Sequence, residues 1–362
     1  MSLRDEMPKK VRCLRVPKKQ GEKALALANE ARAVDKKFEV QRDEDFLYIP
    51  LISQPQEDTL KTLRENGVTF QILTCTLQER KKQRPSLTEV LSTELPPHLL
   101  TSLSHAADFV GDIAIIEVPQ ELDAYKKIIG EAILKTNKNV RTVLAKAGAV
   151  SGTYRLREFS VIGGQQKTET VHREFGCQYS VDVAKAYFSP RLSYEHKRVA
   201  SLVKENETIV DMFAGVGPFA ILIAKTHQNV KVYAIDANPH AFEYLKKNIR
   251  LNRAVGEVHP FLGDARHVVD EKVMGVADRV IMNLPEKAIE FVDAACRALK
   301  PEGGMIHFYS FVSVSNPLEA TKLRLAEAVE KTGRKVTEVP FSRMVRETAP
   351  YEWQAVLDVN IC

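Results

Sequence analysis

A glycine turn between an apolar stretch and a predicted helix carries the clearest chemical signal in this sequence. Gly215-x-Gly217-x-x-Ala220 comes shortly after the apolar residues Ile209 and Val210. Without a Cβ, the two glycines let the backbone approach a bound cofactor closely. Asp236 lies 19 residues beyond Gly217, where an acid that binds a cofactor ribose is expected. Both NAD and S-adenosylmethionine offer such a ribose, so this pattern leaves the two cofactors open.

Three further polar positions follow predicted strands and favour a methyl donor. Asp211 ends the first strand, where a carboxylate suits a cationic sulfonium and would repel a pyrophosphate. Asp264 follows the third strand, where it can accept a hydrogen bond from an adenine amino group. Asn283-Leu-Pro285 closes the fourth strand with an amide and a rigid bend. Ordinary structural roles remain open, because Asp236 can cap the next helix and Asn283 can form a turn.

The segment that carries these residues alternates predicted strands with predicted helices. The strands are expected at 208–210, 230–235, 258–262, 279–282 and 305–309, and near 336 and 355. Alternation of this kind implies parallel pairing with right-handed crossovers, and hence a doubly wound α/β sheet. Ligands of such sheets bind beyond the carboxyl ends of the strands. The sheet would therefore bring the polar residues together.

The chain is long enough for more than one core, and two smaller α/β domains are expected ahead of the doubly wound sheet. The first is expected at 1–77 and the second at 98–180, and the sheet domain occupies 181–362. The stretch 78–97 is polar, charged and proline-bearing, which is typical of a linker. A short helix is expected inside it from Ser86.

Positive charge is concentrated in one part of the chain. The net charge is +5, but residues 131–200 alone carry 12 Lys+Arg against 6 Asp+Glu. A basic segment just before a cofactor turn suggests a polyanionic substrate, because lysine and arginine gain affinity for phosphates by releasing counterions. A solvated basic face explains the same composition.

The remaining composition narrows the class of protein. The five cysteines are scattered without a C-x-x-C pair, and the histidines show no ligand-like spacing, so neither a disulfide framework nor a metal site is expected. No apolar run approaches the roughly 20 residues that span a bilayer, and residues 1–6 lack the apolar core of a secretion signal. A cytoplasmic protein without a membrane partner is expected.

Several stretches together resemble the archaeal and eukaryotic-type tRNA (guanine(37)-N1)-methyltransferase family. The matching stretches are Val210-Asp-Met-Phe-Ala-Gly-Val-Gly-Pro-Phe219, Ala234-Ile-Asp-Ala-Asn-Pro-His240, Met282-Asn-Leu-Pro285, Tyr187-Phe-Ser-Pro-Arg-Leu192 and residues 346–351. The resemblance implies a class I (Rossmann-like) methyltransferase domain, S-adenosylmethionine as cofactor and tRNA as partner. It also implies that the first domain recognises the outer corner of tRNA and that the basic segment faces the anticodon arm. No obligate protein partner is evident, so a monomer is expected.

The resemblance carries roles onto individual residues. Glu195 looks like the general base and Arg155 like the arginine that contacts guanine O6. Asn283 and Pro285 look like contacts of the target base, and Asp236 and Asp264 like the ribose and adenine acceptors. The expected catalytic group is Glu195, Arg155, Asn283, Pro285, Tyr187 and Arg191. The expected cofactor contacts are Asp211, Phe213, Gly215, Gly217, Asp236, Ala237, Asp264, Ala265 and Asn283.

The chemistry of guanine agrees with the two main residue types. Guanine N1 bears a proton, so its attack on a methyl group needs a base, and a carboxylate such as Glu195 can take that proton. Loss of the proton places negative charge on O6, which Arg155 would stabilise in the transition state. Ordinary alternatives exist here too, because an acid such as Glu195 is favoured at the start of a helix by the dipole and Arg155 can contact phosphate.

Other activities remain open at this point. A wyosine-pathway enzyme that transfers an aminocarboxypropyl group, or a bifunctional guanine and imidazoguanosine methyltransferase, would share the fold. More remote alternatives are an NAD-dependent oxidoreductase and a non-catalytic RNA-binding protein. The Asn283-Leu-Pro285 loop and the 213–219 turn favour methyl transfer to guanine.

Overall fold

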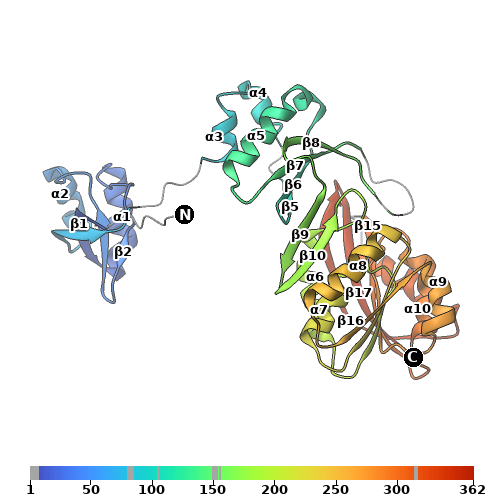
Figure 1. Cartoon of the computed structure of the whole chain (residues 1–362). Coiled ribbons are helices and arrows are strands. Elements are labelled where there is room, and N and C mark those ends of the chain that lie inside the picture. The colour runs from blue at the N-terminus through green and yellow to red at the C-terminus, as the bar shows by residue number, and fades with distance from the viewer. Residues whose placement is uncertain (1–7, 80–84, 104–105, 149–153, 155, 314–316) are drawn as a thin grey trace. The chain divides into compact units, whose positions relative to one another are not determined.

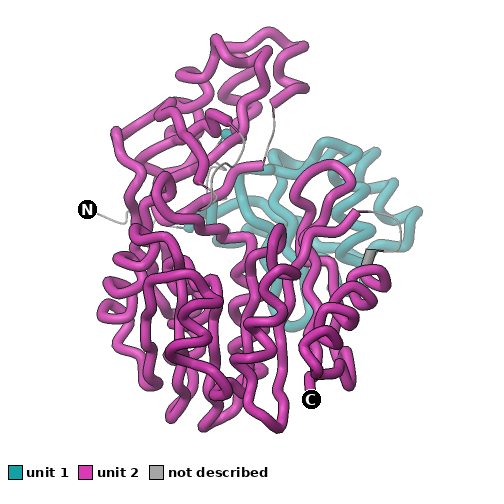
Figure 2. Tube along the Cα trace, turned by 90° about the vertical axis from the view of Figure 1, so that its right-hand side faces the viewer, with its two compact units in different colours: residues 1–85 teal, residues 86–362 magenta. Residues whose placement is uncertain are grey.

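The computed structural model describes residues 8–79, 85–103, 106–148, 154, 156–313 and 317–362. The chain divides into two compact units, residues 1–85 and 86–362, which Figure 2 shows in different colours. Each unit has hydrophobic clusters of its own.

The first unit is a four-stranded antiparallel sheet with the order β2-β3-β1-β4 and two helices (Figure 1). Leu14 and Val16 of β1 are buried and pack with Ala24 and Leu63 of the helices. Its elements are β1 (Lys9–Pro17), η1 (Lys18–Gln20), α1 (Gly21–Glu30), β2 (Gln41–Arg42), β3 (Phe46–Pro50), α2 (Glu57–Glu65) and β4 (Gln71–Leu77).

The second unit begins with a smaller sheet of order β5-β6-β7-β8, in which only β6 and β7 are parallel among the described strands. Its elements are α3 (Leu87–Leu91), α4 (Pro97–Leu100), β5 (Ala107–Val110), β6 (Ile113–Ile116), η2 (Gln120–Tyr125), α5 (Lys126–Thr136), β7 (Thr142–Lys146) and β8 (Phe159–Gly164). Helix α3 lies within the stretch expected as a linker. Ser86 and Glu89 form a capping box there, and Leu91 is buried with Leu122 and Ile129.

A hairpin of β9 (Glu169–Glu174) and β10 (Cys177–Asp182) is held to helix α8 (Pro239–Asn252) by two asparagines. Asn248 Oδ1 accepts from the Ser180 amide at 2.7 Å, and its Nδ2 donates to the Ser180 carbonyl at 3.0 Å. Asn252 makes the same pair of bonds with Gln178, each at 2.7 Å. The expected domain boundary between residues 180 and 181 falls inside β10.

The largest sheet has seven strands in the order β13-β12-β11-β14-β15-β17-β16 (Figure 1). Strands β11 to β15 are parallel, as the alternation of strands and helices predicts. The strands are β11 (Thr208–Asp211), β12 (Lys231–Asp236), β13 (Glu257–Leu262), β14 (Arg279–Met282), β15 (Gly304–Ser313), β16 (Val336–Ala349) and β17 (Glu352–Ile361).

The last two strands differ from the all-parallel expectation. Strand β17 runs antiparallel to β15 over its whole length, and β16 is antiparallel to β17. The two are joined by a tight turn in which Tyr351 adopts a φ of 65°. A turn this short reverses the chain, whereas parallel pairing needs a crossover of a dozen or more residues. The final strand is therefore inserted beside β15 and leaves β16 at the edge.

Helices cover both faces of the seven-stranded sheet. Ile209 and Val210 of β11 point to opposite faces and belong to different clusters, since side chains alternate along a strand. One face is covered by α6, α7 and α8, and the other by α9, α10 and α11. The helical elements of this domain are η3 (Pro190–Leu192), α6 (Ser193–Leu202), α7 (Pro218–Thr226), α8, α9 (Ala265–Val268), η4 (Val269–Val273), η5 (Ala288–Phe291), α10 (Val292–Ala298) and α11 (Pro317–Glu330).

Candidate active site

The glycine turn links β11 to α7 and requires glycine at two positions. Gly215 has a φ of 56° and Gly217 a φ of 92°, which side-chain-bearing residues rarely adopt. A Cβ on Gly217 would stand 2.6 Å from Leu245 Cδ1, so this side chain of helix α8 would have to shift to admit one. Around Gly215 the space is open, because among the described residues only the Tyr187 carbonyl lies within 4 Å of a Cβ there. The turn thus keeps backbone accessible at Gly215, beside the Tyr187 segment.

Asp236, at the end of β12, forms a hydrogen bond with the backbone of the glycine turn. Its Oδ2 accepts from the Gly215 amide at 2.6 Å and its Oδ1 from the Asn238 amide at 2.8 Å. Burial raises the pKa of Asp236, while these two amides oppose the shift. Each carboxylate oxygen keeps a further lone pair for a ribose hydroxyl.

Asp211, at the end of β11, is completely buried. Burial raises its pKa to about 8; the backbone of Phe213 opposes the shift and the charge of Asp236 adds to it. Neither carboxylate oxygen has a hydrogen-bond partner of good geometry among the described residues. Ionising a buried carboxyl group without partners costs free energy. A bound cation or hydrogen-bond donor at this place would reduce that cost.

The expected adenine-side residues lie after β13 and β12. Asp264 is exposed and caps helix α9, where its Oδ1 accepts from the Arg266 amide at 2.9 Å. Ala265 is buried in the first turn of that helix, and Ala237 is exposed after β12. The cap leaves the second carboxylate oxygen of Asp264 available to an adenine amino group.

Asn283 and Pro285 border a small cavity of about 100 Å³. Phe213 of the glycine turn lines the same cavity, so the turn and the Asn283 loop meet there. The other lining residues are Tyr154, Tyr187, Leu284, Phe311, Arg346 and Gln354. Four of the nine lining residues, Tyr154, Tyr187, Phe213 and Phe311, are aromatic, and their flat rings suit a heteroaromatic base.

A hydrogen-bond chain joins several residues that line this cavity. Arg346 donates to the Tyr187 hydroxyl at 2.7 Å and to Ser189 Oγ at 2.8 Å. Its Nε donates to Gln354 Oε1 at 2.9 Å, and Gln354 Nε2 donates to Asn283 Oδ1 at 3.1 Å. The chain connects the Tyr187 segment to the Asn283 loop through the hairpin β16–β17.

A wider cavity of about 390 Å³ adjoins the small one and shares Tyr187, Phe311 and Arg346 with it. Arg191 lines this wider cavity and forms an ion pair with Asp108 of β5. The motif around Tyr187 therefore lies between the smaller sheet and the seven-stranded sheet. The two cavities together form a continuous polar and aromatic site.

Glu195 lies on α6 and is 1% exposed. Its Oε2 accepts from the Tyr309 hydroxyl at 2.8 Å and from Arg198 Nε at 3.0 Å, whereas its Oε1 has no partner among the described residues. Glu195 is absent from the described lining of the small cavity. Tyr309 and the cavity residue Phe311 are two residues apart on β15, so they share a face about 7 Å apart along the strand. Glu195 therefore contacts Tyr309, the neighbour on the same strand face of the cavity-lining residue Phe311.

Arg155 lies outside the described residues. Its neighbour Tyr154 borders the small cavity, and Arg157 lines the wider one. Gln354 and Phe311 were not singled out from the sequence as site residues. Their place depends on the register of β15 with β17, in which they face each other, and a single sequence does not specify that register.

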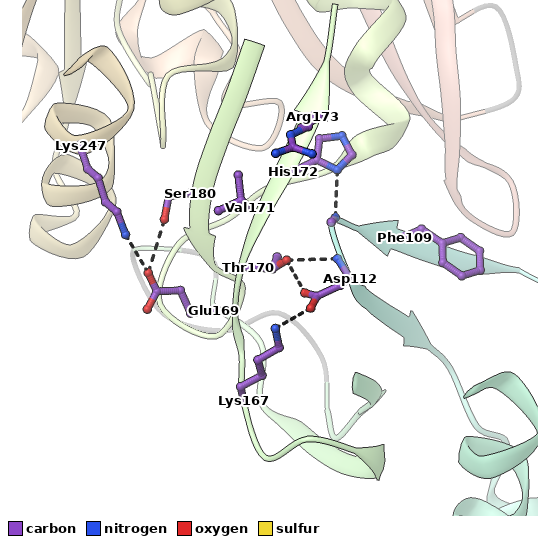
Figure 3. Close-up of a pocket in the computed structure, with 11 residues that line it drawn as sticks. Phe109, Asp112, Lys167, Glu169, Thr170, Val171, His172, Arg173, Ser180 and Lys247 are labelled. Carbon is purple, nitrogen blue, oxygen red and sulfur yellow. Dashed lines mark hydrogen bonds and ion pairs between the residues drawn. The ribbon is translucent and has the colours of Figure 1, made fainter. Parts of the chain in front are cut away.

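A third cavity, of about 950 Å³, lies away from these residues between the β5–β6 turn, the β9–β10 hairpin and α8 (Figure 3). Its charged side chains pair with one another, as Lys167 with Asp112 and Lys247 with Glu169. It shares no lining residue with the two cavities at the Asn283 loop. The glycine turn and the larger cavity are therefore different places in the fold.

Metal-ligating clusters and membrane-spanning helices are both absent from the described residues. No group of three or more His, Cys, Asp or Glu side chains there could hold a metal ion. No helix in the described ranges is both long enough and apolar enough to cross a membrane.

A doubly wound sheet whose first glycine turn meets an acid on the second strand and an asparagine-proline loop on the fourth is the arrangement of class I methyltransferases. Matches to family models give the particular family: a TRM5/TYW2 methyltransferase domain at 170–337, a tRNA methyltransferase 5 N-terminal domain at 13–61 and a TYW2 N-terminal domain at 87–168. The chain belongs to the TRM5/TYW2 family of methyltransferases.

Individual relatives agree with this assignment. The chain is 39% identical to a tRNA (guanine(37)-N(1))-methyltransferase Trm5b of Pyrococcus abyssi, over 96% of this chain and 98% of the relative. It is 35% identical to a tRNA(Phe) (4-demethylwyosine(37)-C(7)) aminocarboxypropyltransferase of Methanocaldococcus jannaschii, over 69% of this chain and 96% of the relative. The oxidoreductase alternative is therefore wrong.

Solved structures show the same similarity. A complex of aTrm5 with tRNALeu is similar with a TM-score of 0.69 and 36% identity, covering 97% of this chain and 99% of that chain. TYW2 of M. jannaschii in complex with AdoMet is similar with a TM-score of 0.54 and 32% identity, covering 71% of this chain and 99% of that chain.

Proposed function

We propose that this protein transfers a methyl group from S-adenosylmethionine to N1 of guanosine 37 in tRNA. The observation that carries the proposal is the full-length match to Trm5b, which includes the N-terminal domain at 13–61. The similar aminocarboxypropyltransferase matches 69% of this chain although 96% of its own length is covered, so part of this chain has no counterpart there. That difference favours guanine methylation over the wyosine-pathway activity.

The cofactor fits the groups that the glycine turn and strand ends offer. Asp236 and Asp264 have carboxylate lone pairs for ribose hydroxyls and an adenine amino group. The buried Asp211 has no hydrogen-bond partner of good geometry among the described residues, and a positively charged cofactor would stabilise its ionised form. The backbone at Gly215 and Gly217 allows close approach, and Phe213, Ala237 and Ala265 lie beside these groups. The bound cofactor supplies an electrophilic methyl group.

Guanine would enter from the wider cavity and stack among the aromatic walls beside Asn283. Tyr187, Pro285 and Phe311 offer flat surfaces there. Arg191 and the adjoining basic side chains of the wider cavity suit the phosphates that flank the base. Leaving its stack costs the nucleotide a few kcal/mol, which these contacts offset.

Glu195 is the proposed acceptor of the N1 proton. Tyr309 and Arg198 hold its Oε2, and Oε1 carries no hydrogen bond among the described residues, so Oε1 is the oxygen available for a proton. Arg155 is the proposed partner of guanine O6, where negative charge develops as the proton leaves.

The partner is proposed to be tRNA, contacted at its outer corner by the first unit and along its anticodon arm by the second. Support comes from the N-terminal domain match and from the basic excess of residues 131–200. The protein is proposed to act as a monomer in the cytoplasm.

The test is primer extension on tRNA incubated with the protein and S-adenosylmethionine, combined with the mass of the modified nucleoside. A block at position 37 that disappears when guanosine 37 is replaced by adenosine supports the proposal. The product mass then separates one methyl group from the larger aminocarboxypropyl group. A modified nucleoside other than 1-methylguanosine would contradict the proposal.

A further inference from the structure

Arg346 begins a chain of hydrogen bonds that ends on Asn283. Arg346 on β16 stands opposite Gln354 on β17 and donates from Nε to Gln354 Oε1. Its other two nitrogens are held by Ser189 and Tyr187. Gln354 is 1% exposed and donates from Nε2 to Asn283 Oδ1. The chain therefore runs through the interior and reaches the small cavity.

The chemistry of Arg346 determines the orientation of both amides. A guanidinium has only donors, so the atom of Gln354 that faces it must be the oxygen. The amide nitrogen of Gln354 then faces Asn283, and because it can only donate, it must meet Oδ1. The Nδ2 of Asn283 consequently points away from Gln354. A donor-only residue at one end thus assigns amide orientations that are otherwise ambiguous.

The backbone carbonyls that follow Asn283 in its loop already accept hydrogen bonds within the protein. The Leu284 carbonyl accepts from two amides of the following turn, at 2.8 and 3.0 Å, and the Pro285 carbonyl accepts from the Phe311 amide at 3.2 Å. Oδ1 of Asn283 already accepts from Gln354. Nδ2 is therefore the side-chain donor that this loop can direct toward a base.

We propose that Arg346 and Gln354 are positioning residues that make Asn283 a hydrogen-bond donor toward the target base. The inference rests on the proposed function, because the base in question is guanine 37. A donor at this place binds O6, on which negative charge develops when N1 loses its proton. It does not bind the 2-amino group, which is itself a donor. Asn283 therefore contributes to the reaction rate and not to recognition of the amino group.

The first experiment compares wild type and Asn283→Ala on tRNA that carries guanosine or inosine at position 37. Inosine lacks the 2-amino group and keeps O6 and the N1 proton. The kcat of Asn283→Ala should fall by about 10²–10³ on both substrates, as when an oxyanion donor is removed. The guanosine-to-inosine ratio should stay at the wild-type value. A variant that loses the preference for guanosine would show that Asn283 binds the amino group, which would overturn the assignment.

The second experiment replaces the amide nitrogen of Gln354, the middle residue of the hydrogen-bond chain, by an oxygen. In Gln354→Glu the carboxylate keeps its contact with Arg346 but meets Asn283 with an oxygen, so the Asn283 amide must rotate and turn Oδ1 toward the cavity. The kcat should fall as far as in Asn283→Ala, with unchanged affinity for tRNA and S-adenosylhomocysteine. Gln178→Glu is the matched control, because Gln178 also accepts from an arginine, Arg173, but on the β9–β10 hairpin. Its kcat should equal that of wild type.

Two results of that experiment would overturn the positioning role. One is wild-type kcat in Gln354→Glu, and the other is a loss of S-adenosylhomocysteine affinity, which would place Asn283 on the cofactor. Thermal unfolding shows whether the variant is folded. If the buried carboxylate prevents folding, Gln354→Met replaces it and leaves the Asn283 amide without a fixed orientation. Its kcat should lie between those of wild type and Asn283→Ala, and wild-type kcat there would also overturn the role.

The wild-type reaction separates this inference from the proposed function. A wild-type product other than 1-methylguanosine at position 37 contradicts the proposed function. A normal wild-type product combined with any of the contrary variant results contradicts only the positioning role of Arg346 and Gln354.

Discussion

Tyr309 on β15 donates its hydroxyl hydrogen to Oε2 of Glu195 at 2.8 Å, and both side chains are buried. Burial raises the pKa of Tyr309 well above its usual value, and the charge of Glu195 adds to the shift. The hydroxyl therefore stays protonated and remains a donor throughout the physiological pH range. Since Arg198 donates to the same oxygen, one side of the carboxylate is fixed while the other stays available.

Replacing Glu195 by glutamine tests the proposed base. We expect Glu195→Gln to lower the rate of methyl transfer by about 10²–10⁴-fold, the usual contribution of a general base, because an amide cannot take the N1 proton. Single-turnover kinetics with guanosine-37 tRNA measure the rate, and filter binding measures tRNA affinity, which should change little. Glu205→Gln, at an exposed acid of the same domain, serves as the control. Wild-type turnover in Glu195→Gln would rule out the role.

Asp211 makes the stability of the cofactor-free protein depend on pH. Its pKa is raised to about 8 in the folded protein, above the ordinary value of 3.8, so the folded state keeps a proton that the unfolded state has lost between these values. Stability should therefore fall as pH rises from about 4 to 8, by at most about 1.4 kcal/mol per pH unit from this residue. Asp211→Asn removes that contribution. Unfolding free energies measured from pH 5 to 8 should fall less steeply in the variant, and equal slopes would contradict the prediction.

Gly217 combines a left-handed backbone with close packing. We expect Gly217→Ala to lose about 1–3 kcal/mol from its strained backbone and more from the contact with Leu245. Gly333→Ala separates these costs, because Gly333 has a φ of 83° with nothing within 4 Å of a Cβ. Urea unfolding of both variants measures the difference. A Gly217→Ala variant no less stable than Gly333→Ala would refute the packing argument.

Asn248 holds the β9–β10 hairpin to α8. Asn248→Ala leaves the buried Ser180 amide and carbonyl without their partner, at a cost of about 1–3 kcal/mol for each unsatisfied group. Asn248→Asp removes only one of the two bonds to Ser180, because a carboxylate still accepts from the Ser180 amide but cannot donate to its carbonyl. Chemical denaturation should rank the aspartate variant between wild type and the alanine variant. Equal stability of all three would show that water replaces the asparagine.

Removal of residues 1–85 tests the division into two units. Each unit has its own hydrophobic clusters, so the chain 86–362 should fold and bind S-adenosylhomocysteine with unchanged affinity. Its affinity for tRNA should fall, because the proposed outer-corner contacts are lost. Calorimetry and filter binding measure the two affinities. Unchanged tRNA binding would contradict the proposed role of the first unit.

The parallel part of the fold could be predicted from the sequence because its signals are local. The apolar run before Gly215, the acid at the end of β12 and the Asn283-Leu-Pro285 loop each lie at the end of a strand that its own local sequence predicts. Once the strands are parallel, their carboxyl ends meet at one edge. The positions of Asp211, Asp236 and Asn283 therefore follow from the topology alone.

The rest of the site depends on contacts between residues distant in sequence. Gln354 meets Asn283 only because β17 is inserted antiparallel beside β15, and the alternation of strands and helices predicts the opposite direction. The burial of Glu195 depends in the same way on Tyr309, which is 114 residues away in the chain. Pairings of this kind are set by tertiary packing, which local pattern does not encode.

One side chain joins the glycine turn to the β9–β10 hairpin, because Asn248 Nδ2 donates to the Val216 carbonyl at 3.0 Å as well as to Ser180. A two-stranded hairpin is barely stable alone in water, so its order depends on this attachment. Any ligand that restrains the turn at Val216 therefore also restrains the hairpin, and the two equilibria are thermodynamically linked. Occupancy of the cofactor site should in this way slow amide hydrogen exchange at Ser180, on a strand outside the seven-stranded sheet.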